Sequence, residues 1–252
     1  MNSIFILSHQ DDEIGVFENI NRSIRNKENV TIFYMTSGKI NKSISKIKKI
    51  GRDKESLRVL TRLGIKEKNV FFFGRINNIR TCALHKNLGL AYAKMHNYLK
   101  NVKGNIKIYT HAYEGGNEDH DACNILVLKL LRKVKNIKLA YQFPFYNSCS
   151  SLFFYSVQKP LKINGKSIKI RVSFNNKIKY IKYLFFYKSQ IKVWVGLYPF
   201  LIFNFLTRNF YYLQEINKNF LVKRPHDGKL LYEKFRDSKF QNLKLNFLNF
   251  LR

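Results

Sequence analysis

The sequence predicts an α/β fold with a doubly wound, mostly parallel sheet, helices on both faces, and a C-terminal cap that contains a β-hairpin and basic, aromatic helices. Three observations lead to this prediction. The 252 residues, 45% of them hydrophobic, are enough to bury the core of one domain with an appendage. In the first half, short apolar runs alternate with stretches of helical periodicity, which is typical of parallel strands joined by helices. In the second half this alternation stops, and basic, aromatic segments follow.

Five short runs in the first half have the apolar, β-branched and aromatic composition of buried strands. We expect these strands at Ile4–Leu7, Val30–Met35, Val70–Phe73, Ile106–Tyr109 and Leu139–Phe143. The segments between them predict helices at Glu13–Asn26, Arg52–Leu63, Leu84–Val102 and Asp119–Val134. Gly64 directly follows the second of these helices and is suited to its C-terminal cap.

Residues 151–252 are predicted to be an extension that caps the core formed by residues 1–150, because no Gly/Ser-rich linker or internal repeat separates the two. Within this cap, Leu152–Val157 predicts a strand and Asn176–Lys192 a basic, aromatic helix. Lys162–Val172 alternates around Asn164-Gly165, a dipeptide that is typical of tight β-hairpins.

The cysteines and the apolar segments indicate a cytoplasmic protein. Cys82, Cys123 and Cys149 are odd in number and widely spaced, which argues against a disulfide scaffold and for a reducing compartment. The N-terminus has no basic region ahead of its apolar run, so a signal peptide is not expected. The longest charge-free apolar stretch, Val193–Thr207, has 15 residues, fewer than the roughly 20 that cross a bilayer. We interpret it first as buried structure and second as a membrane-surface contact.

The formal net charge of +30 is unevenly distributed. Between Ala122 and Gln214 there are 16 Lys and Arg and no Asp or Glu. Two explanations stay open: a composition biased towards residues with A/T-rich codons, and an anionic partner such as a phosphorylated substrate, an acidic membrane or a nucleic acid. Nucleic acid is disfavoured because the sequence has no zinc-finger spacing, helix-turn-helix signature or RNA-recognition motif.

A cluster of metal-ligand residue types follows the first expected strand. His9, Asp11, Asp12 and Glu13 lie within five positions, where the carboxyl end of a strand meets the ligand-binding edge of an open α/β sheet. Imidazole nitrogen and carboxylate oxygen suit Zn²⁺. The alternative is a helix N-terminus, where acidic residues are favoured by the helix dipole.

A second polar cluster, THAYEGGNEDHDA, follows the fourth expected strand. Because parallel strands place their carboxyl ends on one edge of the sheet, the two clusters can converge although they lie far apart in sequence. His120, at the start of the next helix, would then complete a site of two His and one carboxylate with an open position, as in catalytic zinc centres. A lone His there would more often be a helix-start residue.

The two clusters resemble the paired motifs of the LmbE/PIG-L family of zinc-dependent N-acetylglucosamine de-N-acetylases. SHQDDEIG is similar to the family's A-H-P-D-D-E motif, and THAYEGGNEDHDA to its second, G-H-P-D-H motif. TSG, RDKESLRVLTRLGI, YKSQ and RPHDGKLLYE are similar to further parts of the family. The resemblance implies a Rossmann-like fold and hydrolysis of an N-acetyl group. By position it implies Zn²⁺ ligands at His9, Asp12 and His120, and a general base at Asp11.

The sequence departs from the family at two motif positions. Gln10 stands where the family has Pro, and Asn117 where it has the first His of the second motif. The resemblance associates that His with the oxyanion of the tetrahedral intermediate. Asn117 still offers an N–H donor and is our second candidate catalytic residue, but it carries no proton as imidazolium does. Reduced activity, or replacement by His111 or His226, is therefore expected.

The remaining candidates are assigned supporting roles. Arg52 and His226 are expected to touch the substrate, with a helix-surface ion pair and a plain surface His as the alternatives. Glu13, Asp119 and Asp121 are expected to orient the ligating imidazoles.

The basic cap predicts an anionic amino-sugar precursor, phosphorylated or linked to a nucleotide or lipid, with an acidic inner-membrane face as a peripheral contact. Three other functions stay open. These are a metal hydrolase for another amide, a weakened or inactive sugar- or lipid-binding relative, and a basic nucleic-acid binder.

Overall fold

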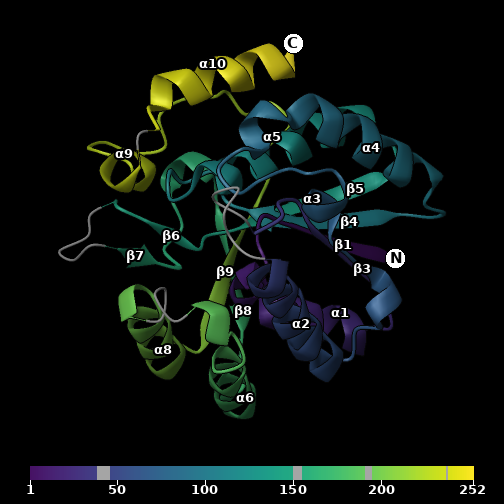
Figure 1. The fold of residues 1–252 in the computed structure, drawn as a ribbon, viewed down its shortest axis with the longest axis vertical. Helices are drawn as coiled ribbons and strands as arrows, with labels where there is room; N and C mark the ends of the chain where they lie inside the picture. Colours follow the sequence, from purple (N-terminus) through teal and green to yellow (C-terminus); the bar gives the residue numbers. More distant parts are fainter. Residues whose placement is uncertain (39–45, 150–154, 191–194, 237) are drawn as a thin grey trace.

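A seven-stranded sheet forms the centre of the computed structural model, which describes residues 1–38, 46–149, 155–190, 195–236 and 238–252 (Figure 1). Its strand order is β3-β2-β1-β4-β5-β9-β8. The strands are β1 (Asn2–Leu7), β2 (Asn29–Tyr34), β3 (Val70–Phe71), β4 (Ile106–His111), β5 (Ile137–Phe143), β8 (Ser167–Arg171) and β9 (Phe210–Glu215). The first five are parallel, whereas β9 pairs antiparallel with both β5 and β8. The predicted α/β class and mostly parallel sheet are therefore confirmed.

Helices cover both faces of the sheet, as Figure 1 shows. They are α1 (Phe17–Arg25), α2 (Lys46–Leu63), α3 (Phe73–Ile76), α4 (Leu88–Asn101), α5 (Glu118–Lys133), α6 (Phe174–Leu184), α8 (Tyr198–Thr207), α9 (Leu231–Phe235) and α10 (Phe240–Leu251). Because side chains alternate along a strand, Ile4 and Ile6 of β1 pack in the core shared with α4, α5 and α10. Phe5 and Leu7 pack on the opposite face, in the core shared with α1, α2, α6 and α8.

The register of the central strands aligns the loops that carry the two polar clusters. Ile6 of β1 lies opposite Phe33 of β2 on one side and opposite Thr110 of β4 on the other. The residues that leave β1 therefore emerge next to the last residue of β4, His111. This edge, at the carboxyl ends of the parallel strands, is where open α/β sheets bind ligands.

Several predicted elements are shorter in the structure than in the sequence prediction. The helix expected at Glu13–Asn26 begins as a 3-10 turn at Asp12–Val16, and the one expected at Leu84–Val102 becomes helical only at Leu88, after a 3-10 turn. The strand expected at Val70–Phe73 ends at Phe71. The chain then enters α3, in which Gly74 packs against the backbone of Thr36 so closely that a Cβ would lie 2.2 Å from the Thr36 Cα.

The hairpin expected around Asn164-Gly165 is wrong. Residues 162–164 form a 3-10 turn, and the strand that follows, β8, pairs with β9 instead of folding back on its own neighbour. The Asn164 side chain is buried, and its amide nitrogen donates a hydrogen bond to the Tyr113 carbonyl at 3.0 Å. This hydrogen bond holds the turn against the core. The two-stranded hairpin of the molecule consists of β6 (Tyr146–Asn147) and β7 (Ser156–Val157).

The second half of the chain extends the same sheet through β8 and β9. Of the strand expected at Leu152–Val157, residues 152–154 lie outside the described residues and Ser156–Val157 forms β7. Of the helix expected at Asn176–Lys192, α6 ends at Leu184, and residues 191–192 lie outside the described residues. Residue 150 also lies outside them, so the boundary between core and cap stays a prediction.

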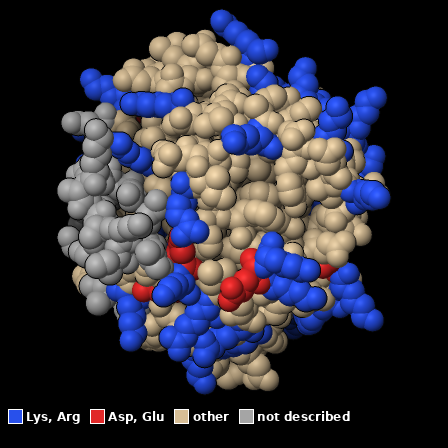
Figure 2. Space-filling view, turned by 45° about the vertical axis from the view of Figure 1, so that its right-hand side comes forward, with Lys and Arg blue, Asp and Glu red and all other residues tan. Residues whose placement is uncertain are grey.

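The surface matches the basic composition. Figure 2 shows Lys and Arg side chains spread over one face, with only a few Asp and Glu among them. Among the helices in the described parts of the chain, none is both long and apolar enough to cross a bilayer.

Candidate active site

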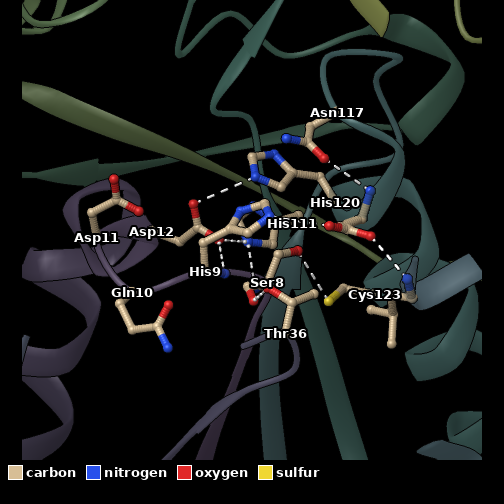
Figure 3. Close-up of polar contacts among 12 residues, drawn as sticks. Ser8, His9, Gln10, Asp11, Asp12, Thr36, His111, Asn117, His120 and Cys123 are labelled. Carbon is tan, nitrogen blue, oxygen red and sulfur yellow. Dashed lines mark hydrogen bonds and ion pairs between the residues drawn. The ribbon is translucent and has the colours of Figure 1, made fainter. Parts of the chain in front are cut away.

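The two polar clusters meet at the carboxyl edge of the sheet (Figure 3). The loop after β1 contributes His9 and Asp12, the end of β4 contributes His111, and the first turn of α5 contributes His120. All four side chains are buried. The convergence expected from parallel strand ends is therefore what the structure shows.

His9, Asp12 and His120 form a three-residue group able to hold a metal ion. Each offers one ligand atom, and these three atoms lie within 4.8 Å of one another. The Asp12 carboxylate lies between the two imidazoles, with Oδ2 3.4 Å from His9 Nδ1 and Oδ1 3.4 Å from His120 Nε2. Among the described residues, neither ring nitrogen of His120 has a hydrogen-bond partner. A buried imidazole without a hydrogen bond is costly, and a metal ion beside Asp12 would satisfy one of its nitrogens.

Asp119 holds the ring of His9 in place. Its Oδ2 lies 3.1 Å from His9 Nε2, and the carboxylate also accepts hydrogen bonds from the N–H groups of Cys82 and Leu84, at 2.5 and 3.0 Å. This contact occupies Nε2, so Nδ1, which lies 3.4 Å from Asp12 Oδ2, is the nitrogen of His9 that remains for a metal ion. Burial opposes protonation of His9, but Asp12 and Asp119 outweigh it and raise the pKa of His9 to about 9.

His111 is the part of this cluster whose position sequence reasoning did not specify. Its ring stacks on that of His120, with centroids 3.8 Å apart and planes 14° apart. Its Nε2 lies 3.0 Å from Asp12 Oδ2 and accepts a hydrogen bond from the Ser8 N–H at 3.2 Å. The only sequence signal for this packing is that His111 ends a strand at the ligand-binding edge.

Burial and mutual charge interactions shift the pKa values of the residues in this cluster. Burial and the neighbouring His111 lower the pKa of His120 to about 3. Burial alone would raise the pKa of Asp12, but His111, His120 and His9 outweigh it and hold that pKa well below its usual range. At neutral pH the cluster therefore contains an ionised Asp12 and a neutral His120, which are the forms that bind metal ions, whereas His9 is protonated and would release a proton on binding one.

Asp11 has an unusual backbone conformation beside this cluster. Its φ of 111° is in the left-handed region, which is strained for a residue with a side chain. Two groups hold it there: the Glu13 carboxylate accepts its N–H at 3.0 Å, and Arg52 Nη2 donates to its Oδ1 at 3.1 Å and to the Gln10 carbonyl at 2.8 Å. Burial raises the pKa of Asp11 to about 7, with Arg52 opposing the shift.

Of the three acidic residues expected to orient imidazoles, the structure places only Asp119 against one. Glu13 instead contacts the Asp11 backbone, and it accepts the Tyr187 hydroxyl at 2.6 Å. Asp121 accepts hydrogen bonds from the N–H groups of Glu114 and Gly115, at 2.9 and 3.2 Å. Glu13 and Asp121 therefore shape the two loops that carry the site.

A cavity of about 170 Å³ opens over these residues. His9, Asp11, Asp12, Asn117 and Tyr146 contribute to its lining, together with two cations, Arg52 and Arg236. Sequence reasoning did not single out Tyr146 or Arg236, because neither belongs to a recognisable motif. His111, His120 and His226 are not among the described residues that line it.

Asn117 caps the N-terminus of α5. Its Oδ1 accepts the Asp119 N–H at 2.9 Å, so its amide nitrogen is directed away from the helix and donates to the Tyr146 hydroxyl at 3.3 Å. Figure 3 shows the Asn117 side chain beside His120. The residue that departs from the motif therefore lies at the cavity.

Comparison with known proteins assigns this arrangement to a family. Residues 4–131 match the family model of the GlcNAc-PI de-N-acetylases, PIG-L, and this range spans both polar clusters. The chain belongs to the PIG-L family. No curated protein sequence matches it.

Solved structures of the same fold include deacetylases. A triple mutant of a deacetylase of the teicoplanin biosynthetic pathway, Orf2*T, is 13% identical with a TM-score of 0.64, covering 86% of this chain and 98% of its own. The zinc-inhibited form of teicoplanin deacetylase Orf2 is also 13% identical, with a TM-score of 0.62 and the same coverage of both chains. The N,N'-diacetylchitobiose deacetylase from Pyrococcus horikoshii is 16% identical with a TM-score of 0.62, covering 89% of this chain and 86% of its own. At these identities the likeness is one of fold.

Proposed function

We propose that this PIG-L family member is a zinc-dependent hydrolase that removes the acetyl group from an N-acetylglucosamine-type sugar. The observation that carries the proposal is the grouping of His9, Asp12 and His120 around one possible metal position, with His9, Asp12 and Asp11 lining the adjoining cavity. Membership of the family and the acetylated sugar named for the Pyrococcus horikoshii relative support the choice of substrate.

Zinc is proposed because two imidazoles, one carboxylate and an open cavity match the donor set of catalytic zinc sites. His9, Asp12 and His120 would hold it. When bound, zinc supplies Lewis acidity, which makes water a stronger acid and an amide carbonyl a better electrophile.

Asp11 is proposed as the general base and then the general acid. Its carboxylate accepts a proton from the water that attacks the acetyl carbonyl, and the tetrahedral intermediate forms with negative charge on the former carbonyl oxygen. Asn117, at the position of the family's oxyanion His, is proposed to help stabilise that oxygen through its amide N–H groups, directly or through the group to which they donate. When the C–N bond breaks, Asp11 gives its proton to the leaving nitrogen, so that the products are acetate and the free amino sugar.

An anionic substrate is proposed from two guanidinium groups in the lining of the cavity, which also contains the Asp11 and Asp12 carboxylates. Arg52 and Arg236 both line it, and Arg236 is held by Glu118, with Nη1 2.7 Å from Oε2. Planar guanidinium groups suit phosphate oxygens, so a sugar phosphate or a diphosphate-linked precursor offers these two arginines a partner that a neutral sugar lacks. His226 lies outside the cavity lining, and its proposed substrate contact has no support in the geometry of the described residues.

Peripheral contact with an acidic membrane is a separate proposal. The net charge is +30, and α8 presents Phe203 and Leu206 at 65% and 54% exposure. Basic and apolar groups together favour an anionic bilayer surface. Sedimentation with vesicles containing phosphatidylserine should show binding at low salt that is lost at high salt. Equal recovery in the supernatant with and without such vesicles would contradict it.

The test of the main proposal is acetate release from N-acetylglucosamine 1-phosphate by the purified protein, with bound metal measured on the same sample. Asp11→Ala should lower turnover by at least about 10²-fold while the zinc content stays near one ion per chain. Glu67→Gln removes an exposed carboxylate far from the motifs and is the matched control. Unchanged turnover in Asp11→Ala would reject the scheme.

Asn117 favours one competing function, a sugar-binding relative without activity. In that case the wild type would bind zinc and the sugar phosphate but release no acetate, and Asn117→His would restore release. Activity in the wild type rejects this alternative.

A further inference from the structure

The cavity contains a hydroxyl group to which the proposed chemistry has so far assigned no role. Tyr146 is part of the lining, and its ring lies over His120 with centroids 5.2 Å apart. The ring is therefore beside one of the three residues able to hold a metal ion, and the hydroxyl lies 3.3 Å from the Asn117 amide nitrogen. No motif marks this residue, which comes from β6, outside the residues matched by the family model.

The contact with Asn117 has a definite direction. Because Asn117 Oδ1 is used by the Asp119 N–H at the cap of α5, the atom facing Tyr146 is the amide nitrogen, and it can only donate. The phenol oxygen therefore accepts, and its own proton is left for another acceptor. Among the described residues, Asn117 is the one hydrogen-bond partner found for this hydroxyl.

The hydroxyl is also held rigidly. The Glu114 carboxylate accepts the N–H groups of Phe145 and Tyr146, at 2.8 and 3.0 Å. Gly116, in the loop before Asn117, packs so closely on β6 that a Cβ would lie 1.9 Å from the Tyr146 carbonyl oxygen. Two segments that are 30 residues apart in sequence are therefore fixed to each other beside the reacting groups, as a pre-organised donor requires.

We propose that the Tyr146 hydroxyl is a catalytic residue that donates a hydrogen bond to the oxyanion of the tetrahedral intermediate, and that Asn117 positions and polarises it. This inference rests on the proposed deacetylase function. The imidazole found at position 117 in the family motif would reach the oxyanion itself. The shorter amide at this position instead passes its hydrogen bond to a phenol that faces the same cavity.

The two other candidates for the missing imidazole do not fit. His111 is fully buried beneath the cluster, with Nε2 used by Ser8 and Asp12, and does not line the cavity. The Nδ1 of His226 lies 2.7 Å from the carbonyl oxygen of Asp227, the next residue along the chain. Neither can reach an oxyanion formed beside Tyr146 without a rearrangement of the loop that carries it.

The test is a double-mutant cycle of Tyr146→Phe and Asn117→Ser. Phe keeps the ring, and Ser keeps an oxygen able to cap α5 but has no amide donor. With N-acetylglucosamine 1-phosphate, Tyr146→Phe should lower kcat about 10²-fold with KM changed less than about threefold, since an oxyanion donor acts mainly in the transition state. Asn117→Ser should lower kcat about tenfold in the wild-type background and less than about threefold when Tyr146→Phe is already present.

A binding measurement gives a readout that does not depend on turnover. A methylphosphonamidate analogue of the amino sugar mimics the tetrahedral intermediate, and Tyr146→Phe should weaken its binding at least about tenfold by calorimetry. Binding of N-acetylglucosamine 1-phosphate should change less than about threefold. Zinc content and melting temperature, measured on each variant, must match the wild type.

The outcomes separate the two proposals. If the wild type releases no acetate, the proposed function fails before Tyr146 is tested. If the wild type is active and Tyr146→Phe keeps kcat and analogue affinity within threefold, the assignment of Tyr146 is overturned. If the fold-losses in kcat of the two single variants multiply in the double variant, the two residues act independently. Tyr146 then remains a donor, but the positioning role of Asn117 is rejected.

Discussion

The carboxylate of Glu13 accepts the backbone N–H of Asp11 at 3.0 Å, while its other oxygen accepts the Tyr187 hydroxyl at 2.6 Å. Asp11 has a φ of 111°, a conformation that costs about 1–3 kcal/mol for a residue with a side chain. Glu13 is therefore one of the two groups that hold the proposed base in a strained conformation, and Tyr187 connects Glu13 to the C-terminal part of the chain.

Removal of the Tyr187 hydroxyl should loosen Asp11 without touching the cavity. We expect Tyr187→Phe to reduce the free energy of unfolding by about 1–3 kcal/mol, because the buried Glu13 carboxylate loses a hydrogen bond, and to lower kcat for acetate release several-fold. Chemical denaturation and steady-state kinetics measure the two effects. Tyr212→Phe, on β9 and outside this network, is the control, and equal behaviour of the two variants would contradict the role of Tyr187.

Asp119 should control metal affinity through His9. Asp119→Asn keeps one oxygen, enough for one of the N–H groups of Cys82 and Leu84, which are bonded to different oxygens of the carboxylate, and it weakens the contact with His9 Nε2 at 3.1 Å. We expect zinc to bind about 10–100-fold more weakly, as is typical when the carboxylate behind a ligating imidazole is lost. Competition with a chromogenic chelator measures the affinity, and the surface variant Glu67→Gln should match the wild type. An unchanged dissociation constant would show that Asp119 does not orient the ligand.

Glu114 should make stability depend on pH. Burial raises its pKa from 4.5 to about 8, although Asn147, Phe145 and Tyr146 donate hydrogen bonds to it. Because the pKa in the folded state is the higher one, the stabilisation from this proton is complete below pH 4.5 and is lost as the pH rises through 8. The loss is at most about 1.4 kcal/mol per pH unit.

The Glu114→Gln variant isolates this titration. As the pH rises from about 5 to 8, the unfolding free energy of the wild type should fall relative to that of the variant. Urea denaturation at each pH measures both free energies. Glu67→Gln corrects for the removal of one carboxylate from the protein. If the unfolding free energy of the wild type relative to the variant stays constant or increases with pH, the raised pKa of Glu114 is contradicted.

Gly116→Ala should separate the loop before Asn117 from β6. Its Cβ would lie 1.9 Å from the Tyr146 carbonyl oxygen, so the backbone must move, and we expect a loss of about 1–3 kcal/mol in unfolding free energy together with most of the activity. Gly89→Ala is the matched control, because that position is in α4 and has no atom within 4 Å of a built Cβ. There, alanine should stabilise the helix by about 0.5–1 kcal/mol. Similar melting temperatures for the two variants would contradict the argument.

The grouping of His9, Asp12 and His120, which could hold a metal ion, was predictable because it depends on local patterns. Short apolar runs mark the strands and therefore their ends. Because parallel strands bring their carboxyl ends to one edge of the sheet, the sequence alone predicts that His9 and His120 lie close together. The motif resemblance supplied the same residues from an independent direction.

Other parts of the site depend on tertiary contacts with no local signal. Asp121 and Glu13 look like Asp119 in sequence, yet they bind backbone N–H groups, because the loops curl back on them. Tyr146 enters the cavity through the packing of Gly116 on β6. Asn164-Gly165 has the composition of a hairpin turn, but a buried bond from Asn164 to the Tyr113 carbonyl redirects the chain, and β8 finds its partner in β9.

The position of β9 also bears on how the protein is synthesised. β5 ends at Phe143, and the strand that covers its edge, β9, begins only at Phe210, with β8 added outside it. While a ribosome translates the intervening segment, β5 remains an open edge with unpaired backbone groups, and this is the stage at which a nascent chain associates wrongly with its neighbours. Chaperone dependence during expression should therefore be greatest for chains truncated between these two strands.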